Sequence, residues 1–172
     1  MRILDATAGS RSIWYQKNHP YVTFMDKRKV DLWDKTKDKK FSSTRRIKVD
    51  PDVVSEWKDA PFPDNYFDMI VFDPPHLIRK KEWSDSSMCV RYGKLYQDSW
   101  RQEIKEGVDK LFHILKPDGV FILKWCETDK SVDEVIKLFP YPPLVGTRTG
   151  QGNKNHWIVF LKYDVNQKLI EG

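Results

Sequence analysis

Apolar residues along the chain fall into short runs that polar turns separate. Five of these runs have the length and composition of β-strands: 2–4, 21–25, 52–55, 67–72 and 120–125. The fourth and fifth runs are almost continuously apolar, which is typical of strands covered on both faces in a parallel sheet. The pattern therefore predicts a parallel sheet with buried strands.

Helical periodicity is clearest between the last two of these runs. Six apolar residues repeat there at helical spacing, with charged residues between them: Trp100, Ile104, Val108, Leu111, Phe112 and Leu115. This helix is expected to end at the turn sequence Lys-Pro-Asp-Gly at 116–119. A second helix is expected after Ser131, where Ser-Val-Asp-Glu is a capping-box pattern. A short first helix is expected after Gly9, ended by Asn-His-Pro at 18–20.

The C-terminal part contains two β-like runs, 144–149 and 156–163, joined by Gly-Gln-Gly-Asn, which indicates a hairpin. Alternating strands and helices followed by this hairpin predict an α/β fold: a doubly wound, Rossmann-like, mostly parallel sheet with a C-terminal antiparallel hairpin. With 172 residues and no internal repeat or linker, we expect a single domain, 1–172. The segments 34–48 and 77–96 are long and polar, so they are expected to be functional lids or disordered.

Basic charge is concentrated in one segment of the chain. Residues 27–48 contain ten Lys and Arg against three Asp, whereas the whole chain carries a net charge of +5. Such a segment suits contact with phosphates, and a solvated loop without a partner is the equal alternative. No apolar stretch approaches the roughly 20 residues that cross a bilayer. Cys89 and Cys126 form no Cys-x-x-Cys pair, so we expect a cytoplasmic protein without a disulfide framework, a metal site or membrane contact.

The tetrapeptide Asp73-Pro74-Pro75-His76, directly after the run 67–72, is the most informative stretch of the chain. A buried strand that ends in this way presents a carboxylate and rigid backbone carbonyls at the edge of the sheet, because proline has a locked φ and no N–H. An acceptor pair of this kind suits a substrate NH2 group, and the ring of His76 suits a flat substrate. The alternative is a proline-rich strand end that merely closes a loop.

A second group of candidate residues follows the first predicted strand: Asp5, Ala6, Thr7, Ala8, Gly9 and Ser10. Folds of the α/β class bind nucleotides at this edge of the sheet, where small residues let the backbone approach a ligand. The segment resembles the first motif of class I methyltransferases, in which an acidic residue leads into a small, glycine-containing turn. The resemblance implies the class I methyltransferase architecture, S-adenosylmethionine as the cofactor, and a turn that cradles the amino acid part of that cofactor.

Further positions fit the same family in the same order, over roughly residues 2 to 162. By resemblance, Asp26 at the end of the second strand accepts hydrogen bonds from the ribose hydroxyls, Glu56 meets the adenine amino group, and Trp57 packs on the adenine face. Taken singly, Asp26 also suits a helix N-cap, and Trp57 also suits the core. Arg11 stands where many relatives have glycine, so its side chain must point away from the cofactor or contact the cofactor carboxylate.

The tetrapeptide at 73–76 resembles the (Asp/Asn/Ser)-Pro-Pro-(Tyr/Phe/Trp) signature of methyltransferases that act on adenine N6, cytosine N4, some guanine N2 positions and protein glutamine. The resemblance implies that Asp73 and the Pro74 carbonyl each accept one N–H and stabilise positive charge developing on nitrogen. The predicted catalytic residues are therefore Asp73, Pro74, Pro75 and His76, with no metal and no covalent intermediate. His76 departs from the usual large aromatic residue. Together with the Gly-Ser-Arg turn and a Lys-Trp strand end, the stretch Asp-Pro-Pro-His-Leu resembles small methyltransferases of phages and prophages.

Residues 77–96 interleave basic and aromatic side chains, a combination that suits a nucleic acid strand through phosphate contact and base stacking. A surface loop that uses Trp83 and Tyr92 to attach to the core is the equal alternative. No segment is large enough for a separate target-recognition region, and extruding a base from duplex DNA costs free energy. DNA or RNA is therefore the expected partner, and single strands, RNA loops or action together with another protein are favoured over duplex DNA alone.

Three functions remain open at this point. The first is an S-adenosylmethionine-dependent N-methyltransferase acting on an exocyclic amine of a nucleic acid base, above all adenine N6 or cytosine N4. The second is the same enzyme class acting on a protein glutamine or a small planar amine, and the third is a catalytically idle nucleotide- or nucleic-acid-binding module. Because the first strand begins at residue 2 without a preceding helix, we also expect an exposed apolar strip there that a homodimer covers.

Overall fold

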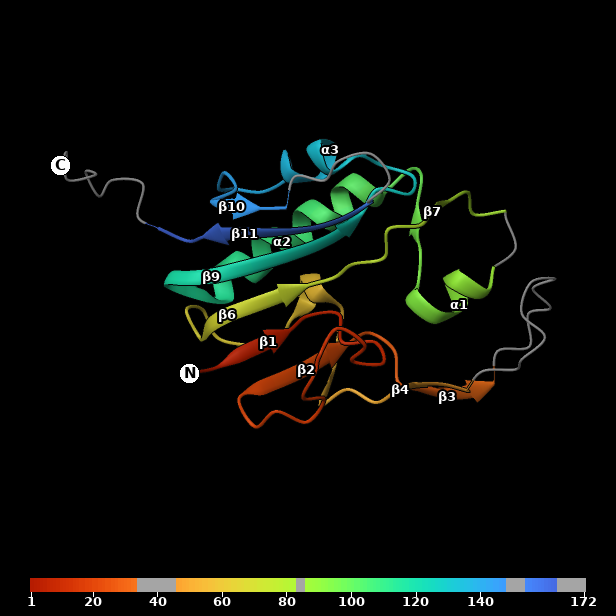
Figure 1. Cartoon of the computed structure of the whole chain (residues 1–172), viewed down its shortest axis with the longest axis horizontal. Helices are drawn as coiled ribbons and strands as arrows, with labels where there is room; N and C mark the ends of the chain where they lie inside the picture. The colour runs from red at the N-terminus through yellow and green to blue at the C-terminus, as the bar shows by residue number, and fades with distance from the viewer. Residues whose placement is uncertain (34–45, 83–85, 148–153, 164–172) are drawn as a thin grey trace.

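The computed structural model describes residues 1–33, 46–82, 86–147 and 154–163, which form a seven-stranded sheet with helices packed against it (Figure 1). The spatial order of the strands is β10-β11-β9-β6-β1-β2-β5. β11 runs antiparallel to both of its neighbours, and the other pairs are parallel. The predicted α/β fold is thus confirmed. In chain order the strands are β1 (Ile3–Asp5), β2 (Val22–Asp26), β5 (Val53–Val54), β6 (Phe67–Phe72), β9 (Leu115–Cys126), β10 (Val145–Gly146) and β11 (Asn155–Leu161).

The strand order reverses at β1. From β1 the chain proceeds through β2 to the edge strand β5, and it then returns to β6 on the other side of β1. Ile3 accordingly pairs with Val22 on one side and with Met69 on the other. In open α/β sheets, ligands bind outside the carboxyl ends of the strands at such a reversal. The topology therefore directs attention to the ends of β1 and β6.

The amphipathic helix α2 (Trp100–Ile114) covers one face of the sheet and runs behind β9 in Figure 1. Its apolar side chains join the main core, where the ring of Phe112 stacks on Phe121 of β9 with centroids 4.7 Å apart. Gly107 lets the short 3-10 helix η1 (Trp57–Asp59) approach α2, because a Cβ at residue 107 would lie 2.0 Å from Trp57 Cδ1. The predicted helix from Trp100 is confirmed.

The predicted N-cap of the helix expected after Ser131 is also confirmed. Helix α3 (Val132–Ile136) begins after Ser131, whose Oγ accepts the N–H of Glu134 at 3.3 Å. The N–H of Val132 donates to Glu127 Oε1 at 2.7 Å, so a carboxylate directly after β9 supports the same helix start as the Ser131 hydroxyl.

Two predictions of local structure are wrong. Residues 9–20 form turns and bends instead of a helix, because Gly9 and Arg11 adopt positive φ angles of 50° and 56°, outside the right-handed helical region. The sequence Lys-Pro-Asp-Gly at 116–119 follows the end of α2 at Ile114, as predicted, but it does not precede the strand, because β9 already begins at Leu115 instead of at residue 120. It forms an irregularity inside β9, where the N–H of Asp118 donates to the carbonyl of Lys162 at 2.7 Å.

The described parts of the two predicted lid segments contain regular structure. β3 (Val30–Trp33) pairs antiparallel with β4 (Arg46–Val49), so the end of the segment 34–48 is a strand, while 34–45 lie outside the described residues. Residues 83–85 also lie outside them, and they include Trp83, for which base stacking and attachment to the core were equal alternatives. The remainder of 77–96 contains β7 (Ile78–Arg79), α1 (Ser87–Tyr92) and β8 (Leu95–Tyr96), with β7 and β8 parallel.

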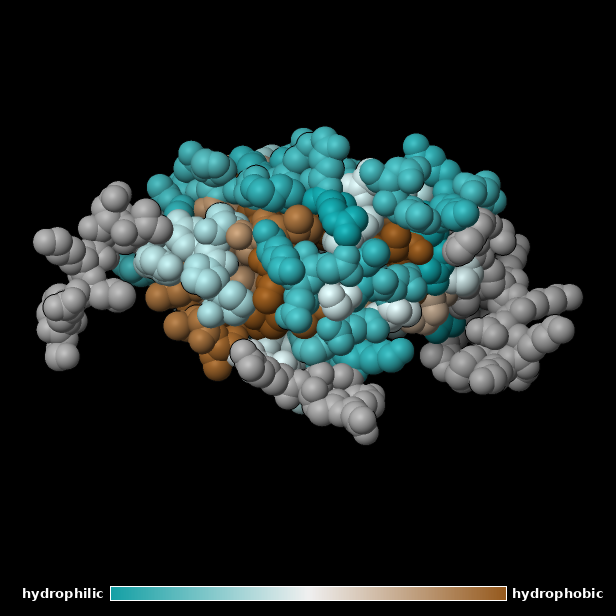
Figure 2. All heavy atoms as spheres, turned by 90° about the horizontal axis from the view of Figure 1, so that it is seen from above, coloured by the Kyte–Doolittle hydropathy of each residue, from teal (hydrophilic) through white to brown (hydrophobic). Residues whose placement is uncertain are grey.

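Seen from the side that carries β10 and α3, the surface shows apolar side chains gathered between polar ones (Figure 2). Leu144 and Val145 at the β10 edge are 65% and 61% exposed, whereas Ile3 and Leu4 of the first strand are buried. An exposed apolar patch suits a protein contact, and self-association of the chain stays a prediction. None of the described helices is both long and apolar enough to cross a membrane.

Candidate functional site

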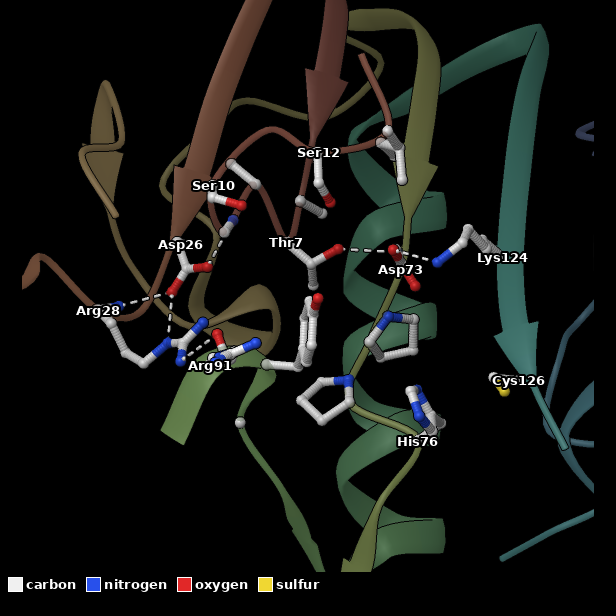
Figure 3. Close-up of a pocket in the computed structure, with 18 of the residues that line it drawn as sticks. Thr7, Ser10, Ser12, Asp26, Arg28, Asp73, His76, Arg91, Lys124 and Cys126 are labelled. Atoms are coloured by element: carbon white, nitrogen blue, oxygen red, sulfur yellow. Dashed lines mark hydrogen bonds and ion pairs between the residues drawn. The ribbon is translucent and has the colours of Figure 1, made fainter. Parts of the chain in front are cut away.

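A crevice of about 320 Å³ opens at the carboxyl ends of β1 and β6 (Figure 3). This volume lies within the range of cofactor and small-molecule pockets. Its walls come from the turn after β1, the end of β2, the segment after β6, and α1, which lies beyond the strand ends in Figure 1. The crevice brings together most of the residues predicted from the sequence: Ala6, Thr7, Ala8, Gly9, Ser10, Asp26, Trp57, Asp73, Pro74, Pro75 and His76.

The turn after β1 is fixed by side chains that bind its backbone. The Asp5 carboxylate accepts the N–H of Thr7 at 3.1 Å and the indole N–H of Trp14 at 2.6 Å. Gly9 has a φ of 50°, a region that glycine adopts without a steric penalty, and its N–H donates to Asp26 Oδ2 at 2.9 Å. The turn and the end of β2 are therefore held in one relative position.

Asp5 supports the turn from below and does not line the crevice. Its side chain is almost fully buried, and this burial raises the pKa of Asp5 to about 7. The hydrogen bonds from Thr7 and Trp14 act in the opposite direction, while the negative charges of Asp73 and Asp26 add to the rise. Asp5 is therefore an acid that titrates near neutral pH directly beneath the glycine turn.

Asp26 connects the crevice to α1 through Arg28. Its Oδ1 accepts the backbone N–H of Arg28 at 2.8 Å and the Nε–H of the same residue at 3.2 Å. The Arg28 guanidinium also donates to the carbonyls of Val90 and Arg91, at the end of α1, at 3.3 and 3.2 Å (Figure 3). A carboxylate has about four acceptor positions. Hydrogen bonds from the described residues fill three of them on Asp26, and one position on Oδ2 remains for a ligand.

Asp73 lies where the Pro-Pro motif meets the glycine turn. Its backbone N–H donates to Thr7 Oγ1 at 2.8 Å, and its Oδ2 accepts a hydrogen bond from Lys124 Nζ on β9 at 2.8 Å (Figure 3). Burial raises the pKa of Asp73, and the Lys124 ammonium counteracts this rise. Oδ1 accepts no hydrogen bond from the described residues, so it is the Asp73 oxygen that a ligand can reach.

The two prolines of the motif are buried, and α1 packs next to them. Gly93 ends α1 with a φ of 82° and lies so close to Pro75 that a Cβ at residue 93 would be 3.1 Å from Pro75 Cγ. Ser86 begins the helix, since its Oγ accepts the N–H of Cys89. This packing places Met88, Arg91 and Tyr92 on the wall of the crevice.

His76 follows the prolines and lines the same crevice. Burial lowers the pKa of the His76 imidazole because it disfavours the charged ring. The Asp73 carboxylate opposes this effect, and the Lys124 ammonium adds to it. The ring is therefore held as a neutral imidazole near pH 7.

Three further predicted positions lie partly or wholly outside the crevice. Trp57 is a buried core residue that also lines the crevice, and its Nε1–H donates to the carbonyl of Glu103 at 3.2 Å. Glu56 is not among the lining residues, and its carboxylate lies 3.7 Å from Lys27 Nζ. Arg11 points away from the crevice, where its guanidinium stacks on the ring of Phe24 at 3.9 Å.

Sequence reasoning did not include several crevice residues among the predicted site residues. One sequence feature could have placed Lys124 in the site: it lies at the end of the next apolar strand after Asp73. Arg28 carries only the general signal of a basic residue close to Asp26. The residues of α1, including Arg91 and Tyr92, reach the crevice because the segment 77–96 folds back over it. No local sequence pattern predicts that tertiary arrangement.

Comparison with known proteins identifies the fold. No protein-family model matches this sequence, and no curated protein matches it. The 1,6-didemethyltoxoflavin-N1-methyltransferase of Burkholderia thailandensis, solved with 1,6-didemethyltoxoflavin and S-adenosylhomocysteine, superposes with a TM-score of 0.52 at 15% identity, over 95% of this chain and 71% of that one.

Two further solved structures give the same result. A TehB-like S-adenosylmethionine-dependent methyltransferase from Corynebacterium glutamicum has a TM-score of 0.55 at 14% identity, covering 95% of this chain and 80% of its own. The PH0226 protein from Pyrococcus horikoshii has a TM-score of 0.58 at 11% identity, covering 95% and 82%. This chain therefore has the fold of the class I S-adenosylmethionine-dependent methyltransferases.

Proposed function

We propose that this chain is an S-adenosylmethionine-dependent N-methyltransferase that methylates an exocyclic amine of a nucleic acid base, adenine N6 or cytosine N4. One observation carries the proposal: Asp73 and its two prolines line the same crevice as the glycine turn after β1. The fold supports the enzyme class, and the motif supports an amine as the methyl acceptor. The resemblance of residues 73–76 to the amino methyltransferase signature supports a nucleic acid base.

The residues of the crevice fit the cofactor. Apart from the two chain neighbours of Gly9, the carbonyl oxygen of Thr7 is the only atom of the described residues within 4 Å of where a Cβ at Gly9 would be, so the turn is open to a ligand that approaches its backbone. The turn would hold the amino acid part, and the remaining acceptor position on Asp26 would hold one ribose hydroxyl. When bound, S-adenosylmethionine supplies an electrophilic methyl group on a positively charged sulfur.

The protein groups then orient the amine and stabilise its charge. An aromatic exocyclic amine is a weak nucleophile because its lone pair is delocalised into the ring. Asp73 Oδ1 and the Pro74 carbonyl would each accept one N–H, which turns the lone pair out of conjugation. As nitrogen becomes positive, a preorganised carboxylate stabilises the transition state more than the ground state. The hydrogen bond between Asp73 and Thr7 keeps the acceptors at a fixed distance from the turn, which favours an in-line arrangement.

Two features of the surface bear on the substrate. Trp157, on β11 beside Lys124, is 39% exposed and provides an aromatic surface near the crevice. In contrast, all five described basic residues of 27–48 already lie within 4 Å of an acidic side chain: Lys27, Arg28, Lys29, Arg46 and Lys48. This pairing weakens the case for a polyanion and favours a small planar amine as the second candidate substrate.

The test separates cofactor binding from substrate choice. Calorimetry with S-adenosylmethionine is expected to show binding, and its absence would remove the enzyme class. Methyl-labelled cofactor is then offered with single-stranded DNA, RNA, protein and adenine-containing small molecules in parallel reactions. Label is expected in the nucleic acid reactions, and it should disappear in Asp73→Ala but persist in Asp98→Ala, which removes an exposed carboxylate outside the crevice. Label only in protein or small molecules would overturn the assigned substrate while keeping the enzyme class.

A further inference from the structure

Methylation of an amine creates a proton that has to leave, and this inference rests on the proposed function. The nitrogen lone pair forms the N–C bond, the C–S bond breaks, and its electron pair goes to sulfur. The nitrogen is then positively charged and still carries both of its hydrogens. A neutral methylamine forms only when one N–H proton passes to a base.

The carboxylates and the lysine ammonium groups of the crevice do not suit this task. Asp73 forms an ion pair with Lys124, and its negative charge is required next to the nitrogen while that atom is positive. The Lys124 ammonium has no lone pair to offer. Asp26 has one acceptor position left and lies at the β2 end of the crevice, and Asp5 does not line it.

His76 differs from these groups because its ring nitrogens are not engaged. Among the described residues, none forms a hydrogen bond with either nitrogen of His76, although the ring lines the crevice two residues beyond Pro74. Figure 3 shows the imidazole on the same side of the crevice as Asp73 and Lys124. In its neutral form it has one nitrogen with a free lone pair, which can accept a proton.

We propose that the His76 imidazole accepts the N–H proton of the newly methylated amine and passes it to solvent. The step is balanced: nitrogen loses a proton and becomes neutral, and the ring becomes an imidazolium. His76 is only half-buried, so the imidazolium reaches water without a relay. The large aromatic residue usual at this position in similar motifs offers a stacking surface but no base.

The charges around His76 are compatible with this role. Asp73 and Asp129 favour the charged ring, whereas burial, Lys124 and Arg79 favour the neutral ring. Burial is the largest of these influences, so the pKa of His76 is lowered and the ring is ready to accept a proton at neutral pH. After proton transfer, the neighbouring Asp73 carboxylate stabilises the imidazolium until the proton leaves.

The kinetic test uses His76→Phe, which keeps a flat ring and removes the base. Transfer from S-adenosylmethionine to a single-stranded oligodeoxynucleotide containing adenine and cytosine is followed from pH 5 to 9. We expect kcat to fall about 10²-fold with KM within about threefold, and the acidic limb of the pH profile to lose one ionisation. His113→Phe, which replaces an exposed histidine on α2, is expected to leave both parameters unchanged.

Two measurements separate a base from a stacking surface. NMR titration of the His76 ring in the ligand-free protein is expected to give a pKa that matches the ionisation lost in His76→Phe. In His76→Ala, added imidazoles are expected to restore transfer in proportion to their basicity. A kcat for His76→Phe within threefold of the unaltered protein, or no dependence of rescue on basicity, would overturn this inference alone. Absence of transfer by the unaltered protein to any amine would overturn it together with the proposed function.

Discussion

Two ion pairs in this protein have similar geometry and different surroundings. In the crevice, Lys124 Nζ lies 2.8 Å from Asp73 Oδ2, and on the β3–β4 hairpin Arg46 donates to both oxygens of Asp31 at 2.7 and 2.6 Å. The side chains of the first pair are each 23% exposed, against 59% and 46% for Arg46 and Asp31. The pKa of Asp73 is raised by burial, whereas the pKa of Asp31 is lowered by its Arg46 partner. Burial, more than contact distance, therefore decides what such a pair does.

The physical reason is the dielectric environment. Water and salt screen the hairpin pair, and exposed pairs of this kind contribute little to stability or reactivity. In the crevice the charges have lost part of their hydration, so each one strongly alters its neighbours and any charge that develops between them. We therefore expect substitutions in the crevice to change chemistry, and matched substitutions in the hairpin to change little.

The largest contrast is expected between Asp73→Ala and Asp31→Ala. Removing the Asp73 carboxylate should lower kcat/KM for methyl transfer about 10³-fold, because the developing positive charge on nitrogen loses its main partner. The affinity for S-adenosylmethionine should stay within about threefold, since the turn after β1 and Asp26 are intact. Asp31→Ala should leave both values unchanged. Rapid transfer by Asp73→Ala would refute the role assigned to this carboxylate.

The second contrast is between Asp5 and Asp31 in how a substitution changes the pH dependence of the free energy of unfolding. The pKa of Asp5 is raised from its usual value of 3.8 to about 7, so between these pH values the folded state holds a proton that the unfolded state has lost. Stability is therefore expected to fall as the pH rises through this window, by about 1.4 kcal/mol per pH unit from this group. Asp5→Asn cannot titrate and should lose that slope, although it also gives up one of two accepted hydrogen bonds.

Urea denaturation at several pH values checks this expectation. The difference in free energy of unfolding between Asp5→Asn and the unaltered protein should change steadily from pH 4 to 7 and then level off. Asp31→Asn is the hairpin control. The folded pKa of Asp31 is lowered below its usual value of 3.8, so its contribution changes only below about pH 4 and its difference should stay nearly constant from pH 4 to 7. A constant difference for Asp5→Asn across this range would show that Asp5 is ionised in the folded protein throughout.

The third contrast removes the cation of the crevice pair. Lys124→Met takes away the ammonium that opposes the burial of Asp73, so the pKa of Asp73 should rise further. The carboxylate is then protonated at a higher pH, and kcat/KM should drop about tenfold near pH 7 and recover as the pH increases. The pH profile of methyl transfer measures this as an upward shift of the acidic limb. Lys124→Arg keeps the charge and should shift the limb much less, whereas an unmoved limb in Lys124→Met would contradict the coupling.

How much of the fold could be predicted from the sequence depends on how far apart along the chain the interacting residues lie. The seven strands of the main sheet, α2 and the cap of α3 follow from local periodicity and end signals, and they form near the predicted positions, whereas β3, β4, β7 and β8 were not predicted. The helix expected after Gly9 does not form, because the positive φ of Arg11 and its contacts with the carbonyls of Lys17 and Asp50 belong to the tertiary structure. Local propensity carries no information about such partners.

The site divides in the same way. Asp73 and the turn at 6–10 lie at strand ends, where a short motif fixes both identity and position, and they meet in the crevice. Lys124 is 51 residues from Asp73 and reaches it through the register of β6 and β9, in which Phe72 pairs with Leu123. Arg28 reaches α1 across 62 residues. Those pairings require the topology, so the chain pattern alone could not assign them.

The smallest effect is expected for Arg46→Ala on the hairpin. Because Arg46 is already paired with Asp31, its removal should leave the urea midpoint unchanged and should not alter how binding of a single-stranded oligonucleotide depends on salt. Fluorescence anisotropy at several salt concentrations gives that dependence as a slope of log affinity against log salt. A slope smaller by about 0.7, the value for one released counterion on a single strand, would show that Arg46 leaves Asp31 for a phosphate. The hairpin would then be part of the substrate-binding surface. The difference between substitutions in the hairpin and in the crevice would then come from their distance to the reacting nitrogen and not from burial.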